Sequence, residues 1–358
     1  VDAPRDPVAD LRQIAFLLER ALEPTYRVRA FRTAAGVVEA LPADELDTRV
    51  ADGTLVKLKG IGDVTARCVT ESLHGEEPVY LRRLLATEPA PIDETTAALR
   101  ALLRGDCHAH SDWSDGGSPI REMALAARDI GHEYLVLTDH SPRLTVASGL
   151  SAERLEQQLD VVAEVNEEFA AEAASGDADP FRLLTGIEVD INEDGTLDQK
   201  PSLLARLDLV VASVHSKLRM PADEMTPRMV AAVANPHTDV LGHCTGRMVR
   251  GRDGRNRRPE SEFDPEIVFA ACEAFGVAVE INSRPERLDP PKRLLRLAVE
   301  AGCVFSIDTD AHAPGQLDWQ VNGCERAARC GVDPASVVNT WTVENLLAWT
   351  ADHAHRPG

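Results

Sequence analysis

The segment Val210-Val211-Ala212-Ser213-Val214-His215 is a short apolar, β-branched run that ends in a histidine. A run of this length and composition predicts a buried β-strand. From Arg104 onward the pattern recurs, with helix-length segments between the runs, which predicts βα units around a parallel sheet. We count seven such runs: 105–109, 134–138, 183–187, 207–214, 240–242, 277–281 and 304–307.

Six of these runs finish in potential metal ligands, and the remaining one, the sixth, ends at Asn282. The ligands are His108 with His110, His140, Glu188, His215, His243, and Asp310 with His312. In a closed βα barrel the carboxyl ends of all strands meet at one rim. An open sheet would instead gather its ligands at a single switch point. We therefore predict an α/β fold, a closed barrel whose mouth brings these residues together.

Each ligand position taken alone has an ordinary explanation. A lone HxH pair is more often incidental, Asp139 and His140 could cap a helix, and a buried Glu188 could pair with an arginine. Taken together, six of the eleven histidines stand at strand ends beside three carboxylates, Asp115, Glu188 and Asp310. This combination predicts a site with several metal ions, and its mixed nitrogen and oxygen ligands suit Zn, Mn or Fe.

Seven strings of this sequence resemble the motifs of the polymerase and histidinol phosphatase (PHP) superfamily: HAHSDWSDG (108–116), LTDHS (137–141), GIEVDI (186–191), ASVHS (212–216), GHCTGR (242–247), EIN (280–282) and DTDAH (308–312). The resemblance covers about residues 104–350. It implies a distorted (β/α)7 barrel with three divalent metal ions that hydrolyses phosphate esters by a metal-activated hydroxide. Hydrolysis at such a centre depends on the positive charge of the metal ions, which stabilises the negative charge of the transition state.

The resemblance also implies how nine ligands divide among the three ions. One ion would be held by His108, His110, Glu188 and Asp310. Glu188 would bridge to a second ion, which His215 and His243 also hold, and Asp115, His140 and His312 would hold the third. Glu188, His215 and Asp310 are the expected catalytic residues.

Basic residues near these motifs are candidates for phosphate binding. They are Lys217, Arg247, Arg284 and Arg287. The stretch 247–258 contains six arginines with glycines between them. Its ordinary interpretation is a solvated loop, and its functional interpretation is a basic arm that meets a polynucleotide backbone.

The first 88 residues predict a small helical domain. Leu58-Lys59-Gly60-Ile61-Gly62-Asp63-Val64 fits the turn of a helix-hairpin-helix motif, in which Gly60, Ile61 and Gly62 would meet a DNA phosphate. A turn without a ligand is the alternative. The surrounding sequence resembles the N-terminal domain of family X DNA polymerases. Residues 89–103 are expected to be a linker and residues 104–350 the barrel. Residues 90–104 leave no room for the polymerase palm.

The bulk composition limits location and partners. The formal net charge of −21 argues against a generally basic, nucleic-acid-binding surface. No segment is apolar enough for a membrane span, no signal peptide is evident, and seven scattered cysteines favour a reducing cytoplasm.

Three functions fit this sequence. The leading hypothesis is a metal-dependent phosphoesterase at DNA ends, a 3′→5′ exonuclease or 3′-phosphatase in DNA repair. The first alternative is a small-molecule phosphatase of the histidinol phosphatase type, which the acidic charge favours. The second is a catalytically idle DNA-binding module, which nine intact ligand positions disfavour.

Overall fold

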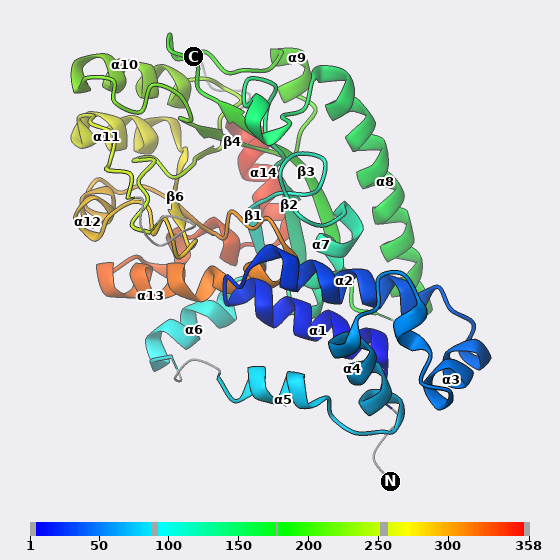
Figure 1. Ribbon diagram of the computed structural model, residues 1–358. Coiled ribbons are helices and arrows are strands. Elements are labelled where there is room, and N and C mark those ends of the chain that lie inside the picture. Colours follow the sequence, from blue (N-terminus) through cyan, green and yellow to red (C-terminus); the bar gives the residue numbers. More distant parts are fainter. Residues whose placement is uncertain (1–4, 88–91, 177, 251–256, 354–358) are drawn as a thin grey trace. The chain divides into compact units, whose positions relative to one another are not determined.

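The computed structural model describes residues 5–87, 92–176, 178–250 and 257–353. The chain divides into two compact units, Val1–Pro91 and Ile92–Gly358. The first unit is helical (Figure 1). Its elements are α1 (Pro7–Arg20), α2 (Thr25–Glu39), α3 (Ala43–Ala51), the 3-10 turn η1 (Leu55–Lys57), α4 (Asp63–Leu73) and α5 (Val79–Leu85).

The helices of the first unit form because their sequences provide both caps and an apolar face. At the start of α1 the Asp6 side chain accepts a hydrogen bond from the Val8 amide, and Pro7 takes the first helical position. Leu11, Ile14 and Leu18 lie on one face of this helix and are fully buried. They pack with α2 and α4 in a single hydrophobic core.

The second unit contains seven parallel strands in the order of the sequence, so each strand pairs with the next (Figure 1). The strands are β1 (Gly105–Ala109), β2 (Tyr134–Leu137), β3 (Arg182–Asp190), β4 (Leu209–Ser213), β5 (Val240–Leu241), β6 (Ala278–Asn282) and β7 (Phe305–Asp308). Ala109, the last residue of β1, forms a parallel bridge with Ala311, which follows β7, so the first and last strands come together. The result is the nearly closed seven-stranded barrel that the sequence predicted.

Helices and short turns connect the strands. They are α6 (Glu94–Leu102), α7 (Ile120–Asp129), η2 (Thr145–Ala147), α8 (Ala152–Ser175), α9 (Pro201–Leu204), α10 (Ala222–Val233), α11 (Pro265–Phe275), α12 (Lys292–Glu300), η3 (Pro314–Trp319), α13 (Gln320–Cys330), η4 (Pro334–Ser336), η5 (Val338–Thr340) and α14 (Val343–His353). Within the described ranges, no helix combines the length and the apolar character that crossing a membrane requires.

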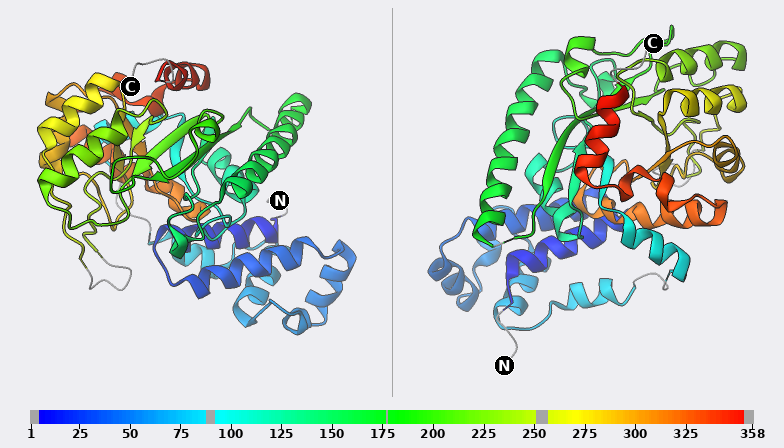
Figure 2. Two further views of the ribbon diagram at one scale, coloured as in Figure 1. Left: turned by 90° about the horizontal axis from the view of Figure 1, so that it is seen from above. Right: turned by 180° about the vertical axis from the view of Figure 1, so that it is seen from behind.

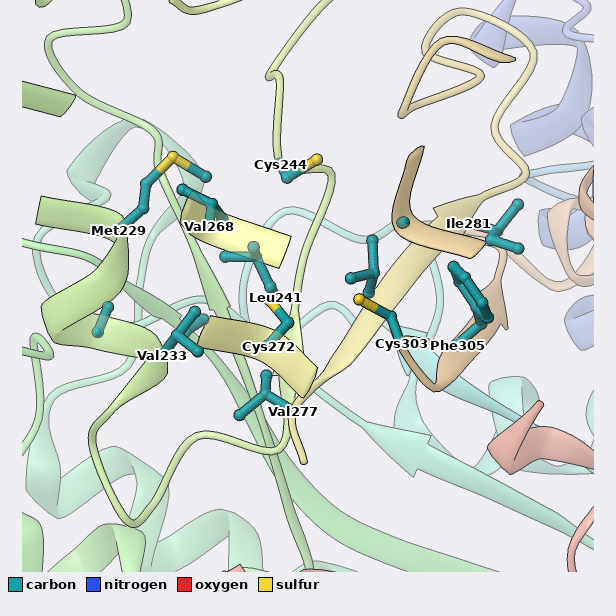
Figure 3. Packing of buried hydrophobic residues seen from close by; sticks show 14 of the residues in the cluster. Met229, Val233, Leu241, Cys244, Val268, Cys272, Val277, Ile281, Cys303 and Phe305 are labelled. Atoms are coloured by element: carbon teal, nitrogen blue, oxygen red, sulfur yellow. The ribbon is translucent and has the colours of Figure 1, made fainter. Parts of the chain in front are cut away.

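The largest hydrophobic core of this unit lies between the strands and the surrounding helices. Figure 3 shows side chains of α10 and α11, such as Met229 and Val268, packed toward Leu241 of β5, and Phe305 of β7 beside Ile281 of β6. These residues are at most 1% exposed. Burying side chains of this size contributes about 1.5–3 kcal/mol each, which holds the strand ends in fixed positions.

Helix α14 contributes to the packing at one end of the barrel. Leu346 of this helix packs with Tyr134, Leu209 and Val240, which are the first residues of their strands. The view from behind in Figure 2 shows α14 in red across the strands. His353 also forms a hydrogen bond with Asp239, whose Oδ1 lies 2.8 Å from His353 Nδ1. The helix therefore covers the amino ends of the strands and leaves the carboxyl ends for a site.

Two details differ from the sequence-based expectations. The expected linker, 89–103, is α6 between Glu94 and Leu102, because Thr96 and Leu99 are buried and the helix packs on α13. Residues 89–91 of that linker lie outside the described residues. Strand β3 extends to Asp190, so Glu188 lies within the strand and does not follow it.

Gly186 in the middle of β3 tests how tightly the barrel is packed. An added Cβ would lie 2.7 Å from Val136 Cγ1 and 2.8 Å from the Leu209 carbonyl oxygen. We expect Gly186→Ala to lower the free energy of unfolding by about 1–3 kcal/mol in urea titrations because the neighbouring strands must move apart. The matched control is Gly36→Ala in α2, where nothing lies within 4 Å, and where alanine should stabilise. Unchanged stability of Gly186→Ala would contradict the packing described here.

Candidate metal centre

Strand β1 places His108 and His110 beside each other at its carboxyl end. Both imidazoles are completely buried, and their ring centroids are 5.1 Å apart. They point the same way because residues two apart in a strand share a face. The His110 amide donates to the Ala311 carbonyl at 2.8 Å, so the segment after β7 lies next to this pair.

Glu188 is the carboxylate at the middle of the site. It is 0% exposed, and imidazole nitrogens surround both of its oxygens. Oε2 lies 3.4 Å from His108 Nε2, 3.6 Å from His110 Nε2 and 2.8 Å from His140 Nδ1. Oε1 lies 3.2 Å from His215 Nε2 and 2.8 Å from His243 Nε2. Strand β3 therefore presents one carboxylate to side chains that follow or belong to four other strands.

A second group of ligand atoms forms around Asp115. Its Oδ1 lies 3.4 Å from His140 Nε2 and 3.2 Å from His312 Nε2. Together with His110, these residues offer ligand atoms that all lie within 4.8 Å of one another. The loop after β1 thus returns to the mouth of the barrel and adds a carboxylate to the histidines there.

Asp310 connects the two groups. Its Oδ1 lies 3.4 Å from His110 Nε2 and 3.5 Å from His312 Nδ1. Asp310 has a φ of 53°, in the left-handed region that a non-glycine residue rarely adopts. Strained backbone of this kind is concentrated at functional sites, where surrounding contacts hold it in place.

The donor atoms of this cluster fit divalent metal ions. Among the described residues, both Glu188 oxygens and the Nε2 atoms of His108, His110, His215 and His243 are buried without a hydrogen-bond partner. Burying polar atoms without a partner is costly. A cation bound between these converging atoms would give them a shared partner. Three sets of side chains bring ligand atoms close enough to hold an ion: His110, Asp115, His140 and His312; His108, His110 and Asp310; His140, Glu188 and His215.

Electrostatics favours the metal-binding protonation state at His110, His243 and Glu188 and the protonated imidazole at His108 and His215. Burial, together with the imidazoles of His312 and His140, holds the pKa of His110 well below its usual value. Burial also lowers the pKa of His243 to about 4. Burial raises the pKa of Glu188, but His215 and His108 lower it by more, so that the net pKa is well below the usual value.

Burial lowers the pKa of His108 and of His215, but Glu280 and Glu188 raise that of His108 by more, and Glu188 and Asp190 raise that of His215 by more. A divalent ion binds the neutral imidazole, so it must displace a proton from these two residues.

The same electrostatics makes His140 a point of competition between protons and metal ions. Burial lowers its pKa, but Glu188 and Asp115 raise it by more, to about 10. A metal ion must therefore displace a proton from this imidazole.

Two further carboxylates contact histidines of this cluster and were not among the site residues predicted from the sequence. Glu280 of β6 lies 2.6 Å from His108 Nδ1, and its other oxygen accepts a hydrogen bond from the His243 amide. Asp190 of β3 lies 2.5 Å from His215 Nδ1. Such partners fix the ring orientation and the tautomer of a metal-binding histidine. Glu280 stands in an apolar strand, and Asp190 shares a strand face with Glu188, so both signals were present in the sequence.

The four basic residues expected at phosphate lie in different places. Arg284 and Arg287 line the cavity at the ligand cluster, and Arg287 Nε lies 3.0 Å from Asp310 Oδ2. Lys217 is exposed and does not line this cavity. The guanidinium of Arg247 donates to the carbonyl oxygens of Arg287 and Leu288, and its side chain lines a neighbouring groove. Residues 251–256 of the expected basic arm lie outside the described residues.

In the helical unit, the turn expected to bind phosphate is present, but two of its backbone amides already donate hydrogen bonds within the turn. Gly60 has a φ of 99°, and the Ile61 side chain is buried in the core. The Ile61 amide donates to the Leu58 carbonyl, and the Gly62 amide donates to Thr65 Oγ1. Amides in the first turn of α4 are thus the ones available for a phosphate.

Comparisons with known proteins agree with both units. Residues 4–77 match the model of the helix-hairpin-helix domain, and residues 106–283 match that of the PHP domain. The DNA polymerase/3′-5′ exonuclease PolX of Bacillus subtilis is 37% identical over 247 residues, which cover 69% of this chain and 41% of that protein. The chain therefore spans less than half the length of this relative.

Other relatives are shorter. A probable phosphatase of Thermoanaerobacter sp. (strain X514) is 26% identical over 250 residues, which cover 66% of this chain and 89% of that protein. Histidinol phosphate phosphatase from Lactococcus lactis, solved in complex with zinc, L-histidinol and phosphate, gives a TM-score of 0.45 at 16% identity, with 64% of this chain and 94% of that chain covered.

Glu280 provides a test of the site that does not remove a ligand. We expect Glu280→Gln to weaken metal binding about 10- to 100-fold, because His108 loses the carboxylate that orients it. Metal affinity is measured by competition with a chelating dye. Glu300→Gln, at the exposed end of α12, is the matched control and should bind as the unaltered protein does. Equal affinity of both variants would show that Glu280 does not position the histidine.

Proposed function

Because this chain belongs to the PHP family of metal-dependent phosphoesterases and also carries a helix-hairpin-helix domain, we propose that it hydrolyses phosphate esters at DNA ends. The reaction would be that of a 3′→5′ exonuclease, a 3′-phosphatase or both, in DNA repair. The observation that carries the proposal is the presence of both domains in one chain. Similarity to the exonuclease-bearing PolX protein supports it.

We further propose that the ligand cluster holds three divalent ions. His108, His110 and Asp310 would hold the first, His215 and His243 the second, and Asp115, His140 and His312 the third, with Glu188 shared between the first two. The separate approach of histidines to Oε1 and Oε2 of Glu188 supports this division. Bound ions of this kind supply Lewis acidity and positive charge toward a phosphate ester. Mixed nitrogen and oxygen donors suit Zn, Mn or Fe.

Two arginines that line the cavity at the ligand cluster would hold the substrate phosphate. Arg287 is proposed to bind a phosphate oxygen, because its Nη1 is buried without a hydrogen-bond partner in the described part of the chain. Its Nε is fixed by Asp310, so the free end of the guanidinium has one orientation. Arg284, held 3.0 Å from His312 Nδ1, would act beside it.

The helical unit would hold DNA by its backbone. Lys57 and Lys59 are exposed and precede the turn at Gly60, and they are two of only five lysines in the chain. Amides at the start of α4 add a partial positive charge. The acidic Asp63 in the same turn opposes an incoming phosphate, so these lysines are expected to matter for binding.

A small-molecule phosphatase remains the second candidate. The net charge of −21 favours it, as does similarity to a probable phosphatase over 89% of that protein's length. The experiment that separates the two supplies Mn²⁺ or Zn²⁺ with end-labelled single-stranded, recessed and 3′-phosphorylated DNA, and with histidinol phosphate. Turnover of DNA ends is the expected result. Rapid turnover of histidinol phosphate with intact DNA would overturn the proposal.

Charge reversal beside the hairpin tests the role of the helical unit. We expect the double change Lys57→Glu and Lys59→Glu to weaken DNA binding about tenfold at low salt and to flatten its dependence on salt. Hydrolysis of a small chromogenic phosphate ester should not change. Lys200→Glu, an exposed lysine of the other unit, is the control. Unaltered DNA affinity of the double variant would exclude this surface as the DNA contact.

A further inference from the structure

The cavity at the ligand cluster has two kinds of lining. Its volume is about 600 Å³, which is in the range of sites for nucleotide-sized ligands. Four arginines give it a cationic part: Arg257, Arg258, Arg284 and Arg287. Glu286 lies among them and pairs with Arg284 at 3.6 Å. The segment around η2 gives it an apolar part, formed by Leu144, Val146 and Ala147.

Val146 is unusually exposed for an apolar side chain. Its exposed fraction is 91%, the highest of any large hydrophobic residue in the described ranges. A single exposed valine is common on protein surfaces. This one lines the cavity that also holds His140 and Asp115, so whatever substrate binds there must pass close to it.

The apolar segment is held rigidly to a ligand residue. The Ala147 amide donates to the Leu144 carbonyl at 3.0 Å, and the Leu150 amide donates to the His140 carbonyl at 2.7 Å. At Gly149 an added Cβ would lie 1.9 Å from the Ser141 carbonyl oxygen, so the two ends of the loop are in closest contact. Leu150 is completely buried and anchors the far end. The exposed position of Val146 is therefore built into the fold.

We infer that Leu144, Val146 and Ala147 form a subsite for the nucleobase of the 3′-terminal nucleotide. The inference rests on the proposed function. The phosphate of that nucleotide would lie toward Arg284, Arg287 and the metal ligands, where charge favours it. The base is the part of a nucleotide with an apolar face, and such faces pack on hydrophobic side chains. Val146 is thus a specificity residue. The cavity would bind the terminal phosphate at its arginines and the adjacent base at its apolar part.

The test compares two oligonucleotides that differ only at the 3′ terminus, where one has a base and the other is abasic. Each is used with and without a 3′-phosphate. For the unaltered protein we expect a KM about five- to tenfold lower for the base-bearing end, as burial of a valine-sized apolar surface implies. Val146→Ser should bring the ratio of the two KM values to about one, and Val146→Leu should preserve it. Ile267→Ser, which changes an exposed side chain on α11 outside the cavity, should also preserve it.

The outcomes separate this subsite from the proposed function. If the unaltered protein turns over both oligonucleotides with equal KM, or if Val146→Ser keeps the preference, the subsite is wrong and the DNA-end activity stands. If neither oligonucleotide is turned over while histidinol phosphate is, the proposed function fails and the subsite fails with it.

Discussion

The carboxylate of Glu188 is completely buried among five histidines, and the site is arranged around its charge. An ionised group removed from water costs several kcal/mol unless charges or donors compensate for it. Here the compensation comes from imidazoles that approach each oxygen separately. The ring nitrogens that face Glu188, which are Nδ1 of His140 and Nε2 of the other four histidines, have no hydrogen-bond partner in the described part of the chain. The proposed pair of cations sharing this carboxylate would satisfy both sets of atoms. The proposed metal-dependent hydrolysis of phosphate esters thus has a physical basis in this chain.

The barrel is what makes this concentration of ligands possible. Ligands separated by as many as two hundred residues meet because each parallel strand ends at the same rim and the apolar core fixes the strands. Behind the ligands, Glu280 and Asp190 set the ring orientation of His108 and His215. Precision in the site is therefore supplied by residues that no substrate would touch, and α14 covers the opposite end of the strands.

The fold could be predicted because strand ends and apolar periodicity are local properties of the sequence. The convergence of His108, Glu188 and Asp310 followed from that topology. Three features depend on packing that has no local signature. Helix α6 forms where a linker was expected, because α13 buries its apolar face. Arg247 binds backbone carbonyls and lines a groove outside the cavity. The exposed apolar loop at Val146 depends on a close backbone contact between Gly149 and Ser141. The only trace of this contact in the sequence is the glycine at position 149.

We propose that Glu188 is shared by two metal ions beside a third, and anomalous X-ray diffraction at a metal absorption edge would locate each ion. Crystals of the full chain would be prepared with Mn²⁺ or Zn²⁺ and measured on both sides of the edge. The account predicts one anomalous peak next to each oxygen of Glu188 and a third among Asp115, His140 and His312. A single peak, or peaks that do not contact Glu188, would contradict it.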